Sequence, residues 1–291
     1  MKRHVGLAAL LPLSACAVAP VAVQSTPVTA AAASVPSGMQ YLYGSGEGAA
    51  ISIQAWRGLV SYVAAQVQAR PADSVVLDEE STLTAPRFVS CGNKPLAAVF
   101  DVDETVLLNL GYEGEDAAHP DRGYDEKRWQ AWERASPGKV AAVPGARKAL
   151  DVLRQIGVTV IFNTNRSAAN AAFAQAALEG VGLGPAKHGE TLFLTGDTPG
   201  GSRKDPRRAI IASRYCVVAM AGDQLGDFSD LFNAPGLSPQ PRRAAVSAPP
   251  LASKWGAGWF LLPNPVYGSA LRGSPDDIFP AATRWTSEES H

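Results

Sequence analysis

The chain of 291 residues is long enough for one large domain or two modest ones, with a hydrophobic core that stands alone. Its 26 basic and 27 acidic residues give a net charge of -1, which excludes the strongly basic footprint of a protein that binds nucleic-acid polymers. A composition that is 46% hydrophobic and 18% charged is typical of a globular protein.

The N-terminal segment is predicted to be an export signal, residues 1–16. A basic start at 1–4 precedes a short apolar run at 5–13, which is too short to span a bilayer, and small residues lead to Cys16. The stretch resembles a bacterial lipoprotein signal, in which the final cysteine is lipidated; an ordinary secretory signal with an incidental cysteine is the alternative. The resemblance implies an exported protein that meets the membrane only through a lipid on Cys16. Because no Asp follows that cysteine, the resemblance favours the outer membrane as the location of the lipidated protein.

Residues 17–38 are small, uncharged and punctuated by proline, which predicts a flexible tether before a domain at 39–291. Cys91 and Cys216 are the other cysteines. They can pair in an oxidising compartment, yet Cys216 lies in the apolar run "YCVVAMA", where a lone buried thiol is equally ordinary. The sequence therefore leaves this disulfide open.

The rest of the chain has the pattern of an α/β protein. Apolar side chains recur at helical spacing over 47–70, before Pro71, and predict an N-terminal helix. After Pro95, apolar runs of strand length alternate with helical segments, which predicts a doubly wound domain with a mainly parallel sheet. The expected strands are 96–100, 158–162, 191–194, 216–221 and 259–262, and the expected helices between them are 145–156, 167–179 and 205–213.

One segment interrupts this alternation. Residues 111–143 are charged and aromatic, include the helical stretch "YDEKRWQAWERASPG", and are too long for a simple connection. We expect them to form a small helical cap over the site, and we call them the cap segment.

Polar residues follow the ends of the expected strands, where ligands of doubly wound sheets bind. Asp101 and Asp103 follow the first strand, two positions apart, and point to one side if the strand geometry continues. Asp223 and Asp227 follow the fourth strand. Carboxylates that converge in this way form an oxygen-only site, which suits Mg²⁺.

Two further residues supply donors for an anion: Thr164 in "NTNR", at the end of the second strand, and Lys204 in "GSRKDP". A hard cation, donors for an anion and a free carboxylate together indicate phosphoryl transfer.

These motifs resemble those of the haloacid dehalogenase (HAD) superfamily of phosphatases, and more closely those of class C bacterial acid phosphatases, lipoproteins that include 5'-nucleotidases. The resemblance covers roughly residues 40 to 270 and implies a Rossmann-like HAD fold. The resemblance is specific because several motifs occur in the order that the family requires. They are "DVDETV", "RWQAWERASPGKVAAVPGA", "NTNR", "GDQLGDF" and "FLLPNPVYGS".

The resemblance implies a Mg²⁺-dependent acid phosphatase that hydrolyses small phosphomonoesters, in particular nucleoside monophosphates, through an aspartyl-phosphate. Asp101 is the implied nucleophile, and Asp103 the implied acid for the leaving group and base for the attacking water. Thr164 and Lys204 are expected to hold the phosphoryl oxygens. The implied metal ligands are Asp101, Asp103 through its backbone carbonyl, Asp223 and, nearby, Asp227.

For the substrate we expect contacts with Asn165, Arg166, Tyr267 and Trp132. Tyr267 and Trp132 offer aromatic faces on which a base can stack. The chain departs from the family pattern at three positions near the expected pocket: Leu108 replaces an acidic residue, and Ala270 and Leu271 replace an aromatic and acidic pair. These departures bear on substrate preference more than on chemistry.

Two alternatives use the same fold. A surface lipoprotein can keep the phosphatase fold as a binding module, although such a module is free to lose catalytic residues and this chain has the full set. A phosphotransferase uses the same residues and passes the phosphoryl group to an alcohol instead of water.

Overall fold

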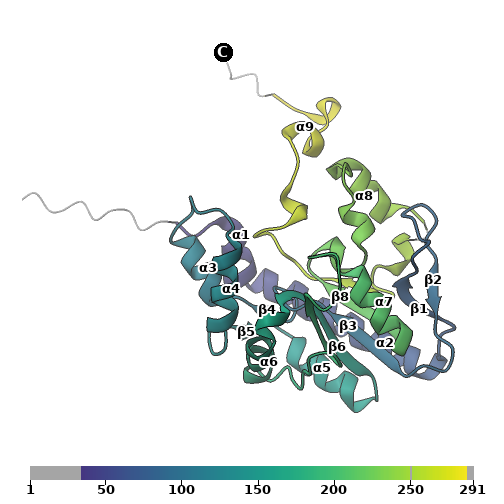
Figure 1. The fold of residues 1–291 in the computed structure, drawn as a ribbon. Helices are drawn as coiled ribbons and strands as arrows, with labels where there is room; N and C mark the ends of the chain where they lie inside the picture. The colour runs from purple at the N-terminus through teal and green to yellow at the C-terminus, as the bar shows by residue number, and fades with distance from the viewer. Residues whose placement is uncertain (1–33, 250, 287–291) are drawn as a thin grey trace, which may run out of the picture. The chain divides into compact units, whose positions relative to one another are not determined.

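The computed structural model describes residues 34–249 and 251–286. Its centre is a parallel five-stranded sheet in the order β7-β6-β3-β8-β9 (Figure 1). The α/β fold expected from the sequence is therefore confirmed, and each expected strand lies within one or a few residues of an observed one. The strands of this sheet are β3 (Leu96–Phe100), β6 (Thr159–Ser167), β7 (Leu192–Thr195), β8 (Cys216–Gly222) and β9 (Trp259–Leu261).

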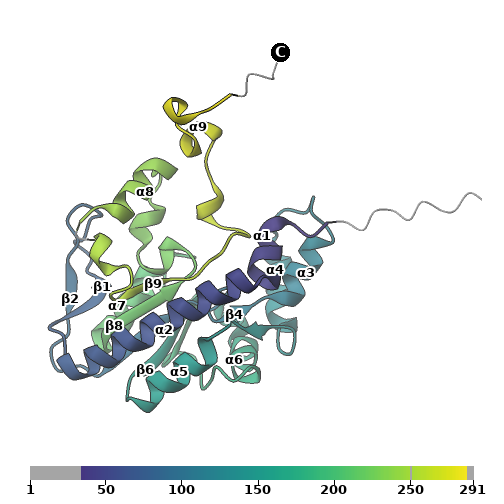
Figure 2. The ribbon, with the colours of Figure 1, turned by 180° about the vertical axis from the view of Figure 1, so that it is seen from behind.

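The sheet is covered on both faces, which explains the uninterrupted apolar runs. In β3, Leu96, Ala98 and Phe100 belong to one core, and Ala97 and Val99 belong to the other. The first core contains residues of three helices, and Figure 2 shows the longest of them, α2, crossing this face. The second core contains residues of α7. The helices of the first core are α2 (Gly46–Ala69), α5 (Ala146–Gln155) and α6 (Ala171–Gly180), and that of the second is α7 (Asp205–Arg214).

Helix α2 begins where Ser45 caps it, because the Ser45 hydroxyl accepts a hydrogen bond from the backbone N–H of Gly48 at 2.9 Å. It is preceded by α1 (Ser37–Met39) and by a π-helical turn (Gln40–Gly44). The expected tether, 17–38, falls mostly outside the described residues, as does the expected signal, 1–16.

A two-stranded antiparallel sheet, which the sequence analysis did not predict, consists of β1 (Asp73–Leu77) and β2 (Phe88–Ser90). It is joined to the main sheet by hydrogen bonds and a disulfide, and the Ser74 hydroxyl of β1 donates to the backbone carbonyl of Val217 in β8 at 3.1 Å. The Trp259 indole donates a hydrogen bond to the backbone carbonyl of Val75 at 2.8 Å, and Cys91, directly after β2, forms a disulfide with Cys216, the first residue of β8. The pairing that the sequence left open is thus present.

The cap segment contains two helices, α3 (Leu110–Ala117) and α4 (Glu126–Ala135), between the paired strands β4 (Leu107–Leu108) and β5 (Ala141–Ala142). The helices pack closely: a Cβ at Gly111 would lie 2.7 Å from the Trp132 ring, so only glycine fits there. The C-terminal part holds α8 (Pro239–Ser247) and α9 (Pro275–Ile278).

Within the described residues, no helix combines the length and the apolar character that a membrane span requires. Short 3₁₀ helices complete the fold at Ala168–Asn170, Leu225–Asp227, Asp230–Asn233, Leu251–Lys254, Ser269–Leu271 and Ala281–Thr283.

Candidate active site

Three neighbouring strands bring the predicted residues to one edge of the sheet. Asp101 follows β3, Thr164 lies near the end of β6, and Asp223 follows β8. The chain builds the sheet outward from β3 in one direction through β6 and β7, and then in the other through β8 and β9. Ligands of doubly wound sheets bind at such a reversal, so these side chains lie where a substrate is expected.

Asp101 is buried and bound by a lysine. Lys204 Nζ donates to Asp101 Oδ1 and also to Asp227 Oδ1, the latter at 2.6 Å. Burial alone would lower the pKa of Lys204, but the two carboxylates raise it overall, so the lysine stays protonated. The backbone N–H of Lys204 donates to Asp230 Oδ1 at 3.0 Å, which holds the residue at the start of α7.

Asp101, Asp223 and Asp227 form a cluster in which one oxygen of each lies within 4.8 Å of the others. The Thr105 hydroxyl lies 3.1 Å from Asp101 Oδ2 and 3.2 Å from Asp223 Oδ1. Burial, followed by the charge of Asp227, raises the pKa of Asp223 to about 7, and burial raises that of Asp101 well above its ordinary value, against the effect of Lys204. Crowded buried carboxylates of this kind fit a hard divalent cation, which would neutralise them.

Asp103 has different partners. β3 ends at Phe100, so the alternation of the strand does not continue through Asp101 and Asp103, and the Asp103 side chain lies outside the carboxylate cluster. Its Oδ1 accepts hydrogen bonds from Arg166 Nη2 at 2.7 Å and Asn109 Nδ2 at 3.0 Å. The Thr164 hydroxyl lies 3.4 Å from its Oδ2. The second carboxylate of the motif is therefore held apart from the first.

Arg166, expected to contact substrate, is completely buried. Besides Asp103, it donates to the Ser136 hydroxyl at 3.0 Å and to Asn109 Oδ1 at 2.9 Å. These contacts join β6 to the cap segment and orient Asp103. In contrast, Asn165 is exposed and lines the cavity at the site, with its Oδ1 accepting from Arg207 Nη2 at 2.6 Å and from the Thr195 hydroxyl at 3.3 Å.

The family model for HAD superfamily, subfamily IIIB (Acid phosphatase) matches residues 48–270. The chain belongs to this family. It is a hydrolase that acts on phosphomonoesters, and this confirms the resemblance that its motifs suggested.

Solved structures of class C acid phosphatase from Bacillus anthracis share the fold of this acid phosphatase. One is 23% identical, with a TM-score of 0.63, over 80% of this chain and 84% of the other. A second, with tungstate bound, is 22% identical, with a TM-score of 0.64, over 86% and 95%. No curated protein sequence gives a significant match.

Glu104 is a site residue to which the sequence analysis gave no role. It is buried, with a positive φ of 56°, and accepts hydrogen bonds from the hydroxyls of Tyr43, at 3.1 Å, and Tyr267, and from the backbone N–H of Asn109, at 2.9 Å. Burial, then the charge of Asp103, raises the pKa of Glu104 to about 7. The available signal was a third acidic residue in "DVDET", directly after an apolar strand.

Asn264 and Gln224 hold Asp223 of the carboxylate cluster, and sequence reasoning also missed them. Asn264 Nδ2 donates to Asp223 Oδ2 at 2.7 Å, and Gln224 Nε2 donates to the same oxygen at 3.0 Å. Both residues lie in stretches that carried the family resemblance, "FLLPNPVYGS" and "GDQLGDF". Nothing in their spacing indicated which side chains would meet.

A cavity of about 2320 Å³ contains the site of this acid phosphatase, and aromatic side chains line it. Tyr267 is 37% exposed and lies in the loop after β9, while Tyr112 and Trp129 of the cap segment contact each other edge to face at 5.1 Å between ring centres. Trp132 is buried, and its indole N–H donates to Asn109 Oδ1 at 3.0 Å. Of the family departures, Leu108 is buried, and Ala270 and Leu271 line the cavity.

Proposed function

We propose that this acid phosphatase is Mg²⁺-dependent and hydrolyses nucleoside monophosphates by way of an aspartyl-phosphate on Asp101. The observation that carries the proposal is the separation of the two aspartates of "DVDET". Asp101 lies against Lys204 and two further aspartates, and Asp103 is held by Arg166. A nucleophile and a proton donor need such different surroundings.

In the first step, an oxygen of Asp101 attacks phosphorus and the bond to the leaving oxygen breaks. Asp103 gives its proton to that oxygen, so that an alcohol leaves rather than an alkoxide. Lys204 and the Thr164 hydroxyl donate to the phosphoryl oxygens, whose charge must be stabilised in the transition state. Because Lys204 already bonds Asp101, it lies close to the place where that charge develops.

In the second step, Asp103 takes a proton from water as the water attacks phosphorus, and the bond from Asp101 to phosphorus breaks to release inorganic phosphate. Mg²⁺, when bound by Asp101, Asp223 and the backbone carbonyl of Asp103 with Asp227 nearby, supplies positive charge that lets a phosphate dianion approach these carboxylates. The chemistry of the donors supports this choice, because all are oxygens.

For the substrate, the aromatic lining supports a nucleoside monophosphate. Tyr267 and Trp129 reach the same cavity as Asp101, from the loop after β9 and from the cap segment. Stacking of a base on an aromatic ring is worth roughly 1–3 kcal/mol and tolerates every base, so we propose a broad specificity. Since Trp132 is buried against Asn109, its proposed contribution is to shape the cap beneath these rings.

We further propose that the protein is exported and anchored to the cell envelope, at the outer membrane, through a lipid on Cys16. Cys16 lies outside the described residues, and its sequence context supports the proposal. The disulfide between Cys91 and Cys216 fits export, because disulfides persist in oxidising compartments.

The test is a screen of purified protein against phosphomonoesters, with and without Mg²⁺, in which inorganic phosphate and free alcohol are both measured. Hydrolysis of AMP that requires Mg²⁺ supports the proposal, and transfer of the phosphoryl group to an added alcohol would favour the phosphotransferase instead. The assembled set of Asp101, Thr164, Lys204 and Asp223 argues against a binding module, which has no need to keep them.

A further inference from the structure

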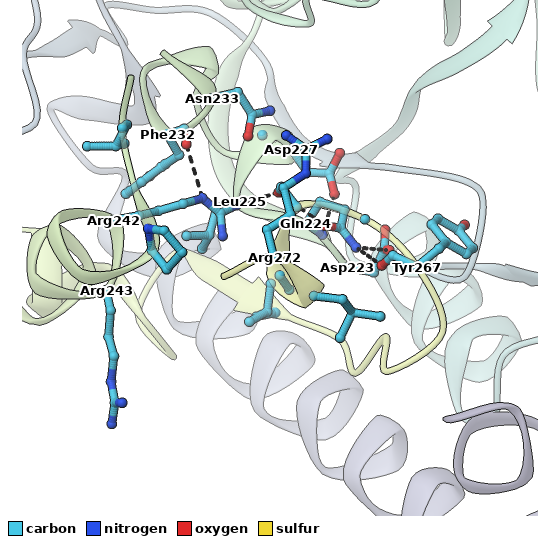
Figure 3. A pocket seen from close by; sticks show the side chains of 18 of the residues that line it. Asp223, Gln224, Leu225, Asp227, Phe232, Asn233, Arg242, Arg243, Tyr267 and Arg272 are labelled. Carbon is cyan, nitrogen blue, oxygen red and sulfur yellow. Dashed lines mark hydrogen bonds between the residues drawn. The ribbon is translucent and has the colours of Figure 1, made fainter. Parts of the chain in front are cut away.

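The catalytic cavity has a second charged region, distant in sequence from the aspartates and not used by the mechanism. Arg242 of α8 and Arg272, which precedes α9, line the same cavity as Asp101 and Asp223. In Figure 3 both lie among the side chains that line the pocket together with Gln224 and Tyr267. Arg243 also lines the cavity, although its side chain extends away from these residues.

Within the part of the chain that the structure describes, these two arginines form no ion pair. Over residues 34–249 and 251–286, neither guanidinium lies within ion-pair distance of a carboxylate. Asp277 also lines the cavity, but its Oδ2 accepts hydrogen bonds from the backbone N–H and the hydroxyl of Ser274, both at 2.8 Å. Unpaired arginines that share a cavity attract an anion, and each offers a planar set of donors that matches phosphate.

Arg242 is fixed in place before any ligand arrives. Its Nε donates to the backbone carbonyl of Phe232 at 3.1 Å, and its Nη2 donates to the Ser269 hydroxyl at 2.8 Å. Arginine has five N–H donors, so three are left. Burial, and then the like charge of Arg272, lowers the pKa of Arg242, which means that an anion bound between the two would relieve a repulsion.

A short chain of contacts joins Arg242 to the catalytic centre. Arg242 donates to Ser269, whose hydroxyl lies 3.4 Å from Gln224 Oε1, and Gln224 Nε2 donates to Asp223 Oδ2 at 3.0 Å. Three contacts therefore separate the guanidinium from a carboxylate of the metal cluster. Both charged regions line one cavity, so a single substrate that carries two phosphates can contact both.

We propose that Arg242 and Arg272 form a subsite for a second phosphate of the substrate, so that the enzyme prefers sugar or nucleoside bisphosphates to the corresponding monophosphates. The inference rests on the proposed function in one respect, because the phosphate that is cleaved is the one bound at Asp101. It adds a substrate class that stacking alone does not select.

The experiment compares kcat/KM for two matched pairs: adenosine 3',5'-bisphosphate with AMP, and fructose 1,6-bisphosphate with fructose 6-phosphate. The second pair has no base, so its ratio is independent of stacking on Tyr267. For the wild type, we expect kcat/KM for each bisphosphate to be about tenfold higher than for the matching monophosphate. The reason is that hydrogen bonds between charged groups are roughly twice as strong as neutral ones. Added salt should reduce this preference, since the arginines are partly exposed and screened.

The variants Arg242→Gln and Arg272→Gln should each lower the ratio of bisphosphate to monophosphate kcat/KM about tenfold, toward one. Arg57→Gln is the matched control, because it removes the same charge from an exposed position of α2 that does not line the cavity, and it should leave the ratio as in the wild type. Since Arg242 also supports Phe232 and Ser269, its variant is checked by thermal unfolding, and Arg272→Gln repeats the test at an exposed residue.

A wild-type ratio near one, or an equal fall in the ratio for Arg57→Gln, would overturn the subsite. If the proposed function is wrong, AMP itself is not hydrolysed, and this result distinguishes its failure from failure of the subsite. In that case the subsite is measured by thermal shift of the Asp101→Asn protein with fructose 1,6-bisphosphate and fructose 6-phosphate. Greater stabilisation by the bisphosphate, lost in the double variant with Arg272→Gln, supports it, and equal stabilisation contradicts it.

Discussion

The Tyr267 hydroxyl donates a hydrogen bond to Glu104, so a residue of the loop after β9 is held by a residue next to Asp103, 163 positions earlier. This bond holds Tyr267 at the cavity, where we propose that its ring stacks on a base.

Removal of the ring and removal of the hydroxyl should therefore differ. Tyr267→Ala should lower the preference for AMP over glycerol phosphate, measured as the ratio of kcat/KM values, by about 10-fold to 100-fold, from a stacking energy of roughly 1–3 kcal/mol. Tyr267→Phe keeps the ring and should retain most of that preference. If Tyr267→Ala lost both substrates equally, the base would bind elsewhere.

Removal of the metal should abolish hydrolysis of phosphomonoesters. Without a cation, the charges of Asp101, Asp223 and Asp227 oppose the approach of a phosphate dianion. Treatment with EDTA should eliminate turnover and added Mg²⁺ should restore it, and Asp223→Asn should require a higher Mg²⁺ concentration. Asp151→Asn, at an exposed position on α5, serves as the control. Full activity in metal-free protein would contradict the prediction.

The two aspartates of "DVDET", Asp101 and Asp103, should respond differently to replacement by asparagine. Asp101→Asn should lose nearly all turnover, because an amide does not attack phosphorus. Asp103→Asn should slow alkyl phosphates by about 10²–10⁴-fold, the usual contribution of a general acid, and aryl phosphates much less, since aryl oxides leave without a proton. Equal losses on the two substrate types for Asp103→Asn would exclude it as the acid.

The cap segment should make stability depend on pH. Burial, followed by the charge of Glu104, raises the pKa of Glu113 to about 8 from an ordinary 4.5. The folded state therefore binds a proton that the unfolded state has lost between these values, and stability falls as pH rises through this window, by up to about 1.4 kcal/mol per pH unit for one group. Glu113→Gln should flatten the profile of melting temperature between pH 5 and pH 8. A profile as steep as that of the wild type would show that other groups cause it.

Cys16→Ser should release the protein from membranes while the purified enzyme keeps its activity, because a lipid on Cys16 is the proposed anchor. Cell fractionation and labelling with fatty acid measure this. A mutant that still sediments with membranes and still takes up label would show that Cys16 is not the site of lipidation.

The sequence predicted the main sheet well because its strands are buried on both faces, which gives β3 and β8 an unbroken apolar run. It did not predict β1 and β2, whose short segments resemble loops, or α8, which buries no residue and so has no apolar stripe. Helix α8 depends on tertiary context that no local pattern records.

The sequence indicated which side chains lie together where the motifs follow strand ends, and it did not indicate partners that other parts of the chain supply. Asp101, Asp223 and Lys204 could be placed together because parallel strands end at one edge of a sheet. Hydrogen bonds to residues far away in the sequence hold Glu104, Asn109 and Asn264. The hydrophobic periodicity of the sequence contains no information about such pairs. For the same reason, Arg166 was expected at the substrate although its guanidinium is buried against Asp103.

The disulfide between Cys91 and Cys216 closes a covalent ring that contains Asp101, Thr164 and Lys204. The loop between α3 and α4, residues 118–125, is exposed and lies within this ring. A protease that cuts this loop therefore produces two fragments that stay joined through sulfur, with Asp101 and Asp223 in the same molecule. Such a cut becomes visible only on a reducing gel, because the disulfide holds the two fragments together.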